Sequence, residues 1–286
     1  MVKNYLKFII GFILLFCTES FSFEVKWIVD GLNEPESAVY HKESDSIFIS
    51  NINGDPLELD KNGYISKISV HGQILEKKWM RGFDAPKGLT TFKNILFVSD
   101  VNKIWKIDIN SKNKEYFKLN NAGFLNDLTV DKNGVVFASD MLKNIIYKLE
   151  NDKLNIWKKS KLLNSPNGLL IEGNNLIVAT WGEISTGFST KIRGKLLKVN
   201  LKTREIKKFF STRPIGNLDG IVFNKDNGYL ATDWIQGKLL SIDKKGIVIK
   251  TKKISEGAAD LEVVMHKNLI LIPMMKNNNL TAFEFN

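Results

Sequence analysis

Cysteine is almost absent from this sequence: its 286 residues include one, Cys17. That residue lies in an N-terminal segment that we expect to be removed, so residues 23–286 contain no cysteine. The main part of the chain therefore has no means of forming a disulfide, a thiol nucleophile or a zinc–thiolate site. Histidine is nearly as scarce, and all three histidines fall in expected turns between strands: His41, His71 and His266.

The sequence also lacks the motifs of several common enzyme classes. It contains no G-x-G-x-x-G, no P-loop and no G-x-S-x-G. Dinucleotide binding, nucleotide hydrolysis and a Ser/His/Asp hydrolase are therefore unsupported. No stretch shows a helical hydrophobic period, which argues against a helical domain.

The N-terminus has the pattern of a secretory signal peptide. Lys3 and Lys7 precede an apolar run at residues 8–16, which is short for a membrane span, and Ser20 and Ser22 supply small residues before a cleavage point. We predict a signal peptide at residues 1–22, cleavage near Ser22 and export to the periplasm or the exterior. An uncleaved anchor is the alternative. No later segment is long and apolar enough to predict a membrane span.

The formal net charge of +10 raises the question of a polyanionic partner. The lysines are spread over expected turns and strand faces, with no block of five like charges and no basic helix interleaved with aromatics. We interpret the charge as a solvated surface, and we expect no nucleic-acid partner. The sequence leaves the oligomeric state open.

A repeated pattern fills the rest of the chain. Six stretches, at residues 34–51, 84–100, 124–140, 165–182, 217–233 and 258–273, each contain a polar residue near their start, followed by two strand-like apolar runs. Up to two further strand-like runs follow each of them. Alignment by polarity places one residue of each repeat in a single column: Glu36, Lys87, Asp127, Asn167, Asp219 and Asp260.

Four-stranded repeats at this spacing predict an all-β, six-bladed β-propeller, formed by residues 23–286 as one domain. The sixth repeat ends before its fourth strand, and residues 23–29 form a strand that belongs to no preceding repeat. We therefore expect the N-terminal strand to close the last blade, which would leave no open edge.

In a propeller, the polar column would form a ring at one mouth of the central channel. Four acids and one lysine give the ring a charge of −4 + 1 = −3. Clustered carboxylates repel one another unless a cation or protons neutralise them. Oxygen ligands alone favour Ca²⁺, with Mg²⁺, Mn²⁺ or Zn²⁺ as alternatives. The other interpretation is a polar, water-filled channel in which Lys87 pairs with Asp127 or Glu36.

Two repeats carry insertions between their second and third strands, near residues 51–63 and 181–194. In an antiparallel blade this connection lies at the same end as the start of the first strand, so both insertions should overhang the ring. They could form a lid or a substrate wall, with Trp181 and Phe188 as contacts, or be plain surface loops.

Four motifs, PESAVY, LNDLTVDKNG, SPNGL and NLDGIVF, resemble those of the senescence-marker-protein/gluconolactonase-like (regucalcin-like) propellers, and the resemblance extends over residues 23–286. We interpret the chain as an uncharacterised exported branch of that family. The resemblance implies a divalent metal, often Ca²⁺, bound by Glu36, Asn167 and Asp219, with Asp260 as an additional candidate. It also implies substrate contacts from Asn126, beside Asp127. The family usually has an arginine two residues before this Asn; here Phe124 takes that position, which argues against a sugar lactone.

The resemblance thus predicts a metal-dependent lactonase or carboxylic ester hydrolase. Asp219 would act as general base, while Asn126, Asp127, Lys87 and Trp181 would contact a small-molecule substrate. Lys87 could bind an anionic group of a ligand. The alternative from another functional class is a non-catalytic propeller of the cell envelope that binds a small ligand or a protein. The sequence leaves this choice, and the substrate, open.

Overall fold

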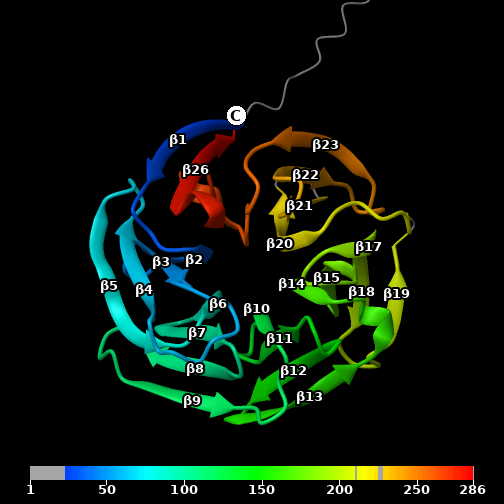
Figure 1. The fold of residues 1–286 in the computed structure, drawn as a ribbon, viewed down its shortest axis with the longest axis horizontal. Coiled ribbons are helices and arrows are strands. Elements are labelled where there is room, and N and C mark those ends of the chain that lie inside the picture. Colours follow the sequence, from blue (N-terminus) through cyan, green and yellow to red (C-terminus); the bar gives the residue numbers. More distant parts are fainter. Residues whose placement is uncertain (1–22, 210, 225–227, 286) are drawn as a thin grey trace, which may run out of the picture.

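The computed structural model describes residues 23–209, 211–224 and 228–285. The predicted signal peptide lies outside the described residues. Within them, six four-stranded sheets surround one axis as the blades of a propeller (Figure 1). The predicted all-β, six-bladed fold is thereby confirmed.

Each blade is an antiparallel meander that runs from the axis outward (Figure 1). Blade 1 contains β2 (Pro35–His41), β3 (Ser46–Asn51), β4 (Gly63–Ser69) and β5 (Ile74–Phe83). Blade 2 contains β6 (Pro86–Phe92), β7 (Ile95–Asp100), β8 (Lys103–Asp108) and β9 (Lys114–Lys118). Blade 3 contains β10 (Leu125–Val130), β11 (Val136–Asp140), β12 (Ile145–Glu150) and β13 (Lys153–Lys159).

Blade 4 contains β14 (Pro166–Glu172), β15 (Asn175–Thr180), β18 (Leu196–Asn200) and β19 (Ile206–Lys208). Between its second and third strands, β16 (Gly182–Ile184) and β17 (Thr190–Arg193) form a separate hairpin. Blade 5 contains β20 (Leu218–Asn224), β21 (Gly228–Asp233), β22 (Lys238–Ile242) and β23 (Val248–Lys253). The described helices, η1 (Lys161–Leu163), η2 (Met265–Lys267) and η3 (Met275–Asn277), are single turns, far too short to cross a membrane.

Blade 6 combines the two ends of the described chain. Its inner strands are β24 (Glu262–Val264), β25 (Leu269–Met274) and β26 (Asn279–Phe285), and its outer strand is β1 (Phe23–Val29). β1 pairs antiparallel with β26, from the pair Phe23 and Phe285 to the pair Val29 and Leu280. Both ends are therefore held in one sheet.

Apolar side chains fill the spaces between neighbouring blades. Between blades 1 and 2, for example, Phe48 and Trp79 pack in one cluster with Leu96 and Trp105. Trp157 lies in the corresponding cluster between blades 3 and 4. Such β-branched, aliphatic and aromatic residues suit half-buried pleated surfaces, and their burial from both sides holds the blades together.

Close to the axis the inner strands approach one another so tightly that three blades require glycine. A Cβ atom on Gly88 would lie 2.6 Å from the carbonyl oxygen of Asn126 on the next inner strand. A Cβ on Gly168 would overlap the carbonyl oxygen of Asp219, and one on Gly220 would lie 2.6 Å from the backbone nitrogen of Leu261. These glycines let the ring of inner strands close.

This packing predicts that Gly168→Ala lowers the free energy of unfolding by roughly 2 kcal/mol, because the clash is with rigid backbone on the adjacent blade. Gly173→Ala is the matched control: a Cβ there would meet no atom within 4 Å, and it carries only the strain of φ = +55°. Urea unfolding of both variants measures the difference. Equal, small effects would show that the inner strands are not in tight contact.

Candidate metal and substrate site

The inner strand of blades 1 to 5 begins with the same irregularity. In blade 1, Pro35 pairs with Asn51, but the next paired residue is Ala38, opposite Ile49. The same offset follows the first pair in blades 2 to 5. The residue directly after the first pair therefore occupies the same structural position in each of these blades, which we call the ring position. It is Glu36, Lys87, Asn126, Asn167 and Asp219 in blades 1 to 5.

This register corrects the polar column in two blades. In blade 3 the ring position belongs to Asn126, while Asp127 lies one residue further on. In blade 6 an isolated bridge pairs Ala258 with Met274, which gives the ring position to Ala259 and the following one to Asp260. Asp127 and Asp260 also share a local pattern, since each accepts a hydrogen bond of 2.7 Å from the next residue's backbone amide. Neighbouring residues of a strand point to opposite sides, so alignment by polarity alone chose the wrong residue twice.

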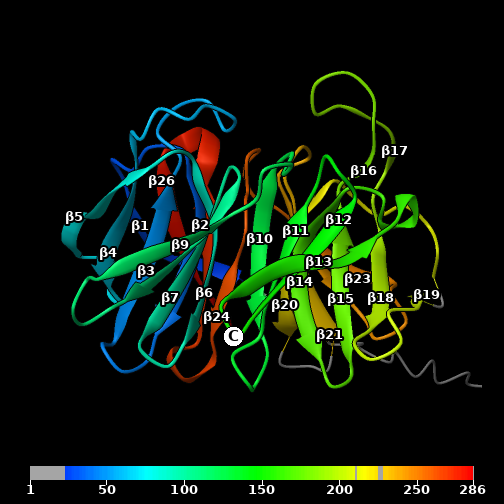
Figure 2. The same cartoon turned by 90° about the horizontal axis from the view of Figure 1, so that it is seen from below.

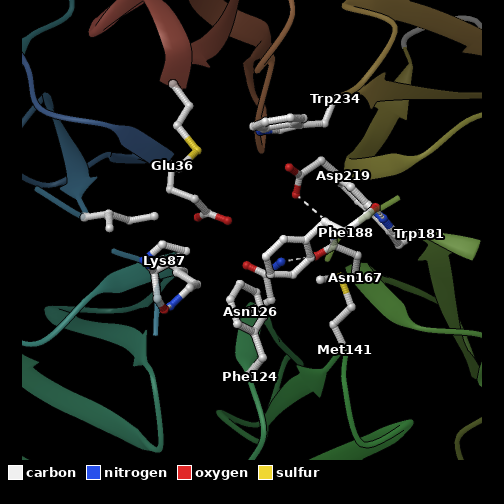
Figure 3. Close-up of a pocket in the computed structure, with 13 residues that line it drawn as sticks. Glu36, Lys87, Phe124, Asn126, Met141, Asn167, Trp181, Phe188, Asp219 and Trp234 are labelled. Carbon is white, nitrogen blue, oxygen red and sulfur yellow. Dashed lines mark hydrogen bonds between the residues drawn. The ribbon is translucent and has the colours of Figure 1, made fainter. Parts of the chain in front are cut away.

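The five polar ring residues line one cavity of about 190 Å³ at the mouth of the channel (Figure 3). The structure thus brings together the predicted metal ligands Glu36, Asn167 and Asp219 with three of the predicted substrate contacts, Asn126, Lys87 and Trp181. Each is at least nine-tenths buried. Asp127, the fourth predicted substrate contact, and Asp260, the additional metal candidate, do not line this cavity.

A chain of hydrogen bonds orders three of these side chains. Asn126 Nδ2 donates to Asn167 Oδ1, and Asn167 Nδ2 donates to Asp219 Oδ1 over 3.0 Å (Figure 3). Asn167 Nδ2 also donates to the Leu218 carbonyl oxygen at 3.1 Å. Two buried oxygens of the ring, Glu36 Oε2 and Asn126 Oδ1, have no hydrogen-bond partner among the described residues. Such atoms are costly unless something binds them.

Burial governs the charge of the two ring acids. Loss of solvent, and then the nearby charges of Asp219, Asp260 and Asp127, raise the pKa of Glu36 well above its usual value. Burial, followed by the charge of Asp260, raises the pKa of Asp219 to about 8, although the hydrogen bond from Asn167 opposes this. Without a cation, the ring therefore favours protonated acids.

Lys87 does not neutralise the ring by direct pairing, as the polar-channel interpretation requires. Its Nζ donates to the carbonyl oxygens of Pro56 at 2.8 Å and Ala85 at 2.9 Å, and it lies 4.6 Å from the centre of the Phe124 ring. No ion pair joins it to Glu36 or Asp127 within the described part of the chain. Burial lowers the pKa of Lys87 to about 8, against the opposing charges of Asp100 and Glu36.

Asp127 and Asp260 form a second acidic layer beside the ring. Asp127 Oδ2 accepts from the Leu169 amide at 2.6 Å, and Asp260 Oδ2 accepts from Ser37 Oγ at 2.7 Å. Burial raises the pKa of Asp127 well above normal and that of Asp260 to about 6. Each of their carboxylate oxygens already accepts a hydrogen bond. These two acids therefore add negative electrostatic potential near the ring, but they offer no open position for a ligand.

The open oxygens make the ring suitable for a hard cation. Among the described residues, no group of three or more His, Cys, Asp and Glu side chains is placed to hold a metal. The candidate set consists of two carboxylates, Glu36 and Asp219, with the amide oxygen of Asn167, which accepts one hydrogen bond from Asn126 Nδ2 and has a second lone pair for a cation. Amide and carboxylate oxygens are typical ligands of Ca²⁺. The unpartnered Glu36 Oε2 and the raised pKa values of both acids indicate a position where a cation would compensate buried negative charge.

Above the ring, the cavity wall is apolar. The two insertions project from the same face of the propeller (Figure 2) and supply Pro56 and Phe188 to the wall. The β16–β17 hairpin is fixed at its base, because Trp181 Nε1 donates to the Phe188 carbonyl oxygen at 2.8 Å and Asn217 Nδ2 donates to Thr190 Oγ1 at 2.9 Å. The predicted overhang is therefore present, and Trp181 and Phe188 both line the cavity.

Much of this wall was missed from the sequence. Besides Phe124, four further residues line it: Ile52, Met141, Trp234 and Met275. Ile52, Met141, Trp181, Trp234 and Met275 share one feature, since each directly follows the last residue of a second strand. An apolar residue thus recurs directly after a polar residue that ends a second strand, such as Asn51, Asp140 or Asp233. This recurrence is visible in the sequence and could have predicted the wall.

The acids at the ends of second strands have a structural role. Asp140 accepts from the amides of Gly123 and Phe124, at 2.7 and 3.1 Å, and so fixes the loop that carries Phe124. Asp100 does the same for Asp84 and Ala85, at 3.0 and 2.8 Å. These bonds satisfy buried backbone donors and position the cavity wall.

The structure is similar to that of a protein provisionally assigned as a gluconolactonase, with a TM-score of 0.70, 16% identity and 92% of each chain covered. It is also similar to a streptogramin B lyase, with a TM-score of 0.62, 14% identity and coverage of 93% of this chain and 98% of the other. A catalytically inactive His-to-Ala variant of virginiamycin B lyase from Staphylococcus aureus, with quinupristin, has a TM-score of 0.59, 16% identity and coverage of 92% and 99%. Comparisons with protein-family profiles and with curated proteins give no match. At these identities the likeness establishes the propeller fold.

The raised pKa values predict that the cation-free protein loses stability as pH rises. A carboxyl whose pKa is higher folded than unfolded stabilises the fold fully below its unfolded pKa, near 4, and this contribution disappears as pH approaches the folded pKa, about 8 for Asp219. We expect the free energy of unfolding in chelator to fall by roughly 2 kcal/mol or more from pH 5 to pH 8, at about 1.4 kcal/mol per pKa unit.

Asp219→Asn should reduce this slope, because it removes one titrating group. Asp108→Asn is the control, since hydrogen bonds from the Ser111 backbone and side chain lower the pKa of the exposed Asp108. Chemical unfolding at several pH values measures the slopes. A stability that rises from pH 5 to pH 8 would contradict the assignment of buried, proton-binding acids.

Proposed function

We propose that this protein is an exported, metal-dependent hydrolase that opens a lactone or a related ester at the propeller mouth. The observation that carries the proposal is the buried all-oxygen set of Glu36, Asn167 and Asp219, with the unpartnered Glu36 Oε2, at the floor of the cavity. The fold it shares with a provisional gluconolactonase supports the class by analogy only.

Glu36, Asn167 and Asp219 would hold the cation, with Ca²⁺ the first candidate and Mg²⁺, Mn²⁺ or Zn²⁺ as alternatives. When bound, such an ion supplies Lewis-acid polarisation of an ester carbonyl and stabilises the negative charge that develops on its oxygen. Asn126 lies beside these ligands and fixes Asn167 through its Nδ2 hydrogen bond. Its unpartnered Oδ1 can accept a hydrogen bond from substrate or water.

Asp219 is the residue best placed to handle the proton. Water adds to the carbonyl carbon and loses a proton to the Asp219 carboxylate, and the ester C–O bond then breaks. The proton returns to the departing ring oxygen, so the product is a hydroxy acid. In the cation-free ring, burial and Asp260 raise the pKa of Asp219 to about 8. A bound cation would lower this pKa and keep the carboxylate deprotonated, as a general base requires.

The similarity to lyases does not favour a lyase reaction over hydrolysis. The inactive variant among them has lost a histidine, whereas no histidine lines this cavity among the described residues. His41, for instance, bonds Ser44 Oγ at 2.9 Å in the turn between β2 and β3, at the other end of the blade. A histidine-dependent elimination therefore has no residue to perform it here.

The proposal predicts that a divalent cation stabilises the chelated chain from Phe23 onward. At a hundredfold excess over its Kd, a cation that binds only the native state contributes about 2.7 kcal/mol, which corresponds to a rise in Tm of about 5–10 °C for a domain of this size. Glu36→Gln and Asp219→Asn should each abolish the rise and lower lactone hydrolysis by about 100-fold or more.

Asp260→Asn is the matched control, because Asp260 is acidic and close to the ring but its oxygens bond Ser37 and Leu261. It should keep the cation-induced rise in Tm. A cation effect without hydrolysis of any lactone or ester would instead favour the non-catalytic binding propeller. No cation effect with any of the four ions would contradict the metal site itself.

A further inference from the structure

The cavity has a polar floor and an aromatic wall, and the two have different tasks. The wall above the ring contains Phe124, Trp181, Phe188 and Trp234, with Ile52, Met141 and Met275. Among the described residues that line this upper part, none has a charged or hydroxyl side chain. The wall is therefore built to exclude water from an apolar group rather than to hydrogen-bond a polar one.

The aromatic rings of the wall form one connected group (Figure 3). Phe188 lies 5.5 Å from Phe124 and 6.4 Å from Trp181, and Trp181 lies 6.0 Å from Trp234, measured between ring centres. Phe124 comes from blade 3, the Trp181 and Phe188 pair from blade 4, and Trp234 from blade 5. Three blades thus converge on a single apolar surface directly above Asn126, Asn167 and Asp219.

Most polar donors near this surface are already engaged, and Trp234 Nε1 is the exception among the described wall residues. Trp181 Nε1 bonds the Phe188 carbonyl oxygen, and Lys87 Nζ bonds the carbonyl oxygens of Pro56 and Ala85. Asn126 Nδ2 and Asn167 Nδ2 donate within the ring. A substrate with several hydroxyl groups would lose its hydration here and find few free donors, which is unfavourable.

The volume of the cavity limits the size of the apolar group that a ligand could place against the wall. Its volume of about 190 Å³ is comparable to that of an engineered apolar cavity of about 150 Å³ that binds benzene. A ring, or a chain of a few carbons, would fill the space above the floor.

We infer that the substrate is a lactone or ester that carries an apolar substituent, held against Phe124, Trp181, Phe188 and Trp234 while its carbonyl faces the ring. Sugar lactones are excluded as preferred substrates. This inference rests on the proposed function, since it names the substrate class of the same site. Phe188 and Trp234 determine specificity: they bind the substituent and take no part in bond making or breaking.

The test compares γ-butyrolactone, γ-octalactone, γ-decalactone and glucono-δ-lactone as substrates of the cation-loaded protein. Each buried methylene is expected to raise kcat/KM by about two- to fourfold until the wall is filled, with glucono-δ-lactone the poorest of the four. The gain should come from a lower KM, because the wall contacts the substituent equally in the ground and transition states.

Phe188→Ala and Trp234→Ala should each raise KM for γ-decalactone by about tenfold, and by more than they raise KM for γ-butyrolactone, because the longer substrate makes more contact with them. Tyr116→Ala is the control for removing an aromatic ring, since Tyr116 is 53% exposed on the outer strand of blade 2. It should leave all four substrates unchanged. Circular dichroism confirms that each variant is folded.

Two results separate this inference from the proposed function. If lactones are hydrolysed but kcat/KM does not rise with alkyl length, or glucono-δ-lactone is preferred, the hydrolase survives and the apolar substrate class is wrong. If nothing is hydrolysed, calorimetry decides: γ-decalactone binding about tenfold tighter than γ-butyrolactone, and weakened in Phe188→Ala, supports an apolar ligand site without catalysis. Equal or absent binding in that case overturns both proposals.

Discussion

The convergence of six inner strands on one axis is the constraint from which the site follows. Gly88, Gly168 and Gly220 let neighbouring strand backbones come into contact. In blades 1 to 5, the irregular start of the inner strand places one polar side chain at the channel mouth. Polar residues far apart in sequence therefore face one another in a small buried space. The carboxylates among them lose solvent there, which raises their pKa values and would favour a bound cation.

The two layers around the mouth divide the chemistry. Glu36, Asn167 and Asp219 line the cavity, whereas Asp127 and Asp260 do not, and the oxygens of these two acids accept from backbone amides and Ser37. The inner layer could therefore hold the proposed cation, and the negative charge of the outer layer would strengthen its binding. Above both, the insertions of blades 1 and 4 supply the apolar wall, so a rigid scaffold carries a site whose specificity depends on loops.

Repeat spacing and strand composition were enough to predict the number of blades, because each blade repeats the same four apolar runs. The same alignment could not fix the ring register in blades 3 and 6. In blade 3 both Asn126 and Asp127 are polar, and in blade 6 the ring position holds Ala259 while the neighbouring Asp260 carries the charge. The pairing register alone distinguishes the two residues in each blade.

The Lys87 contacts could not be predicted from the sequence either, since Pro56 reaches the lysine only when the blade 1 insertion folds over it. The resemblance to gluconolactonase-like propellers predicted Glu36, Asn126, Asn167 and Asp219 as a group, and these four do line one cavity.

The most direct measurement is anomalous diffraction from crystals of the chain from Phe23 onward soaked in Mn²⁺, with Ca²⁺ as competitor. The account predicts a peak at the cavity floor, within about 2.0–2.6 Å of oxygens from Glu36, Asn167 and Asp219, that disappears in Asp219→Asn and when Ca²⁺ is in excess. A peak in the layer of Asp127 and Asp260, or no peak at the mouth, would contradict it and leave the ring as a polar channel.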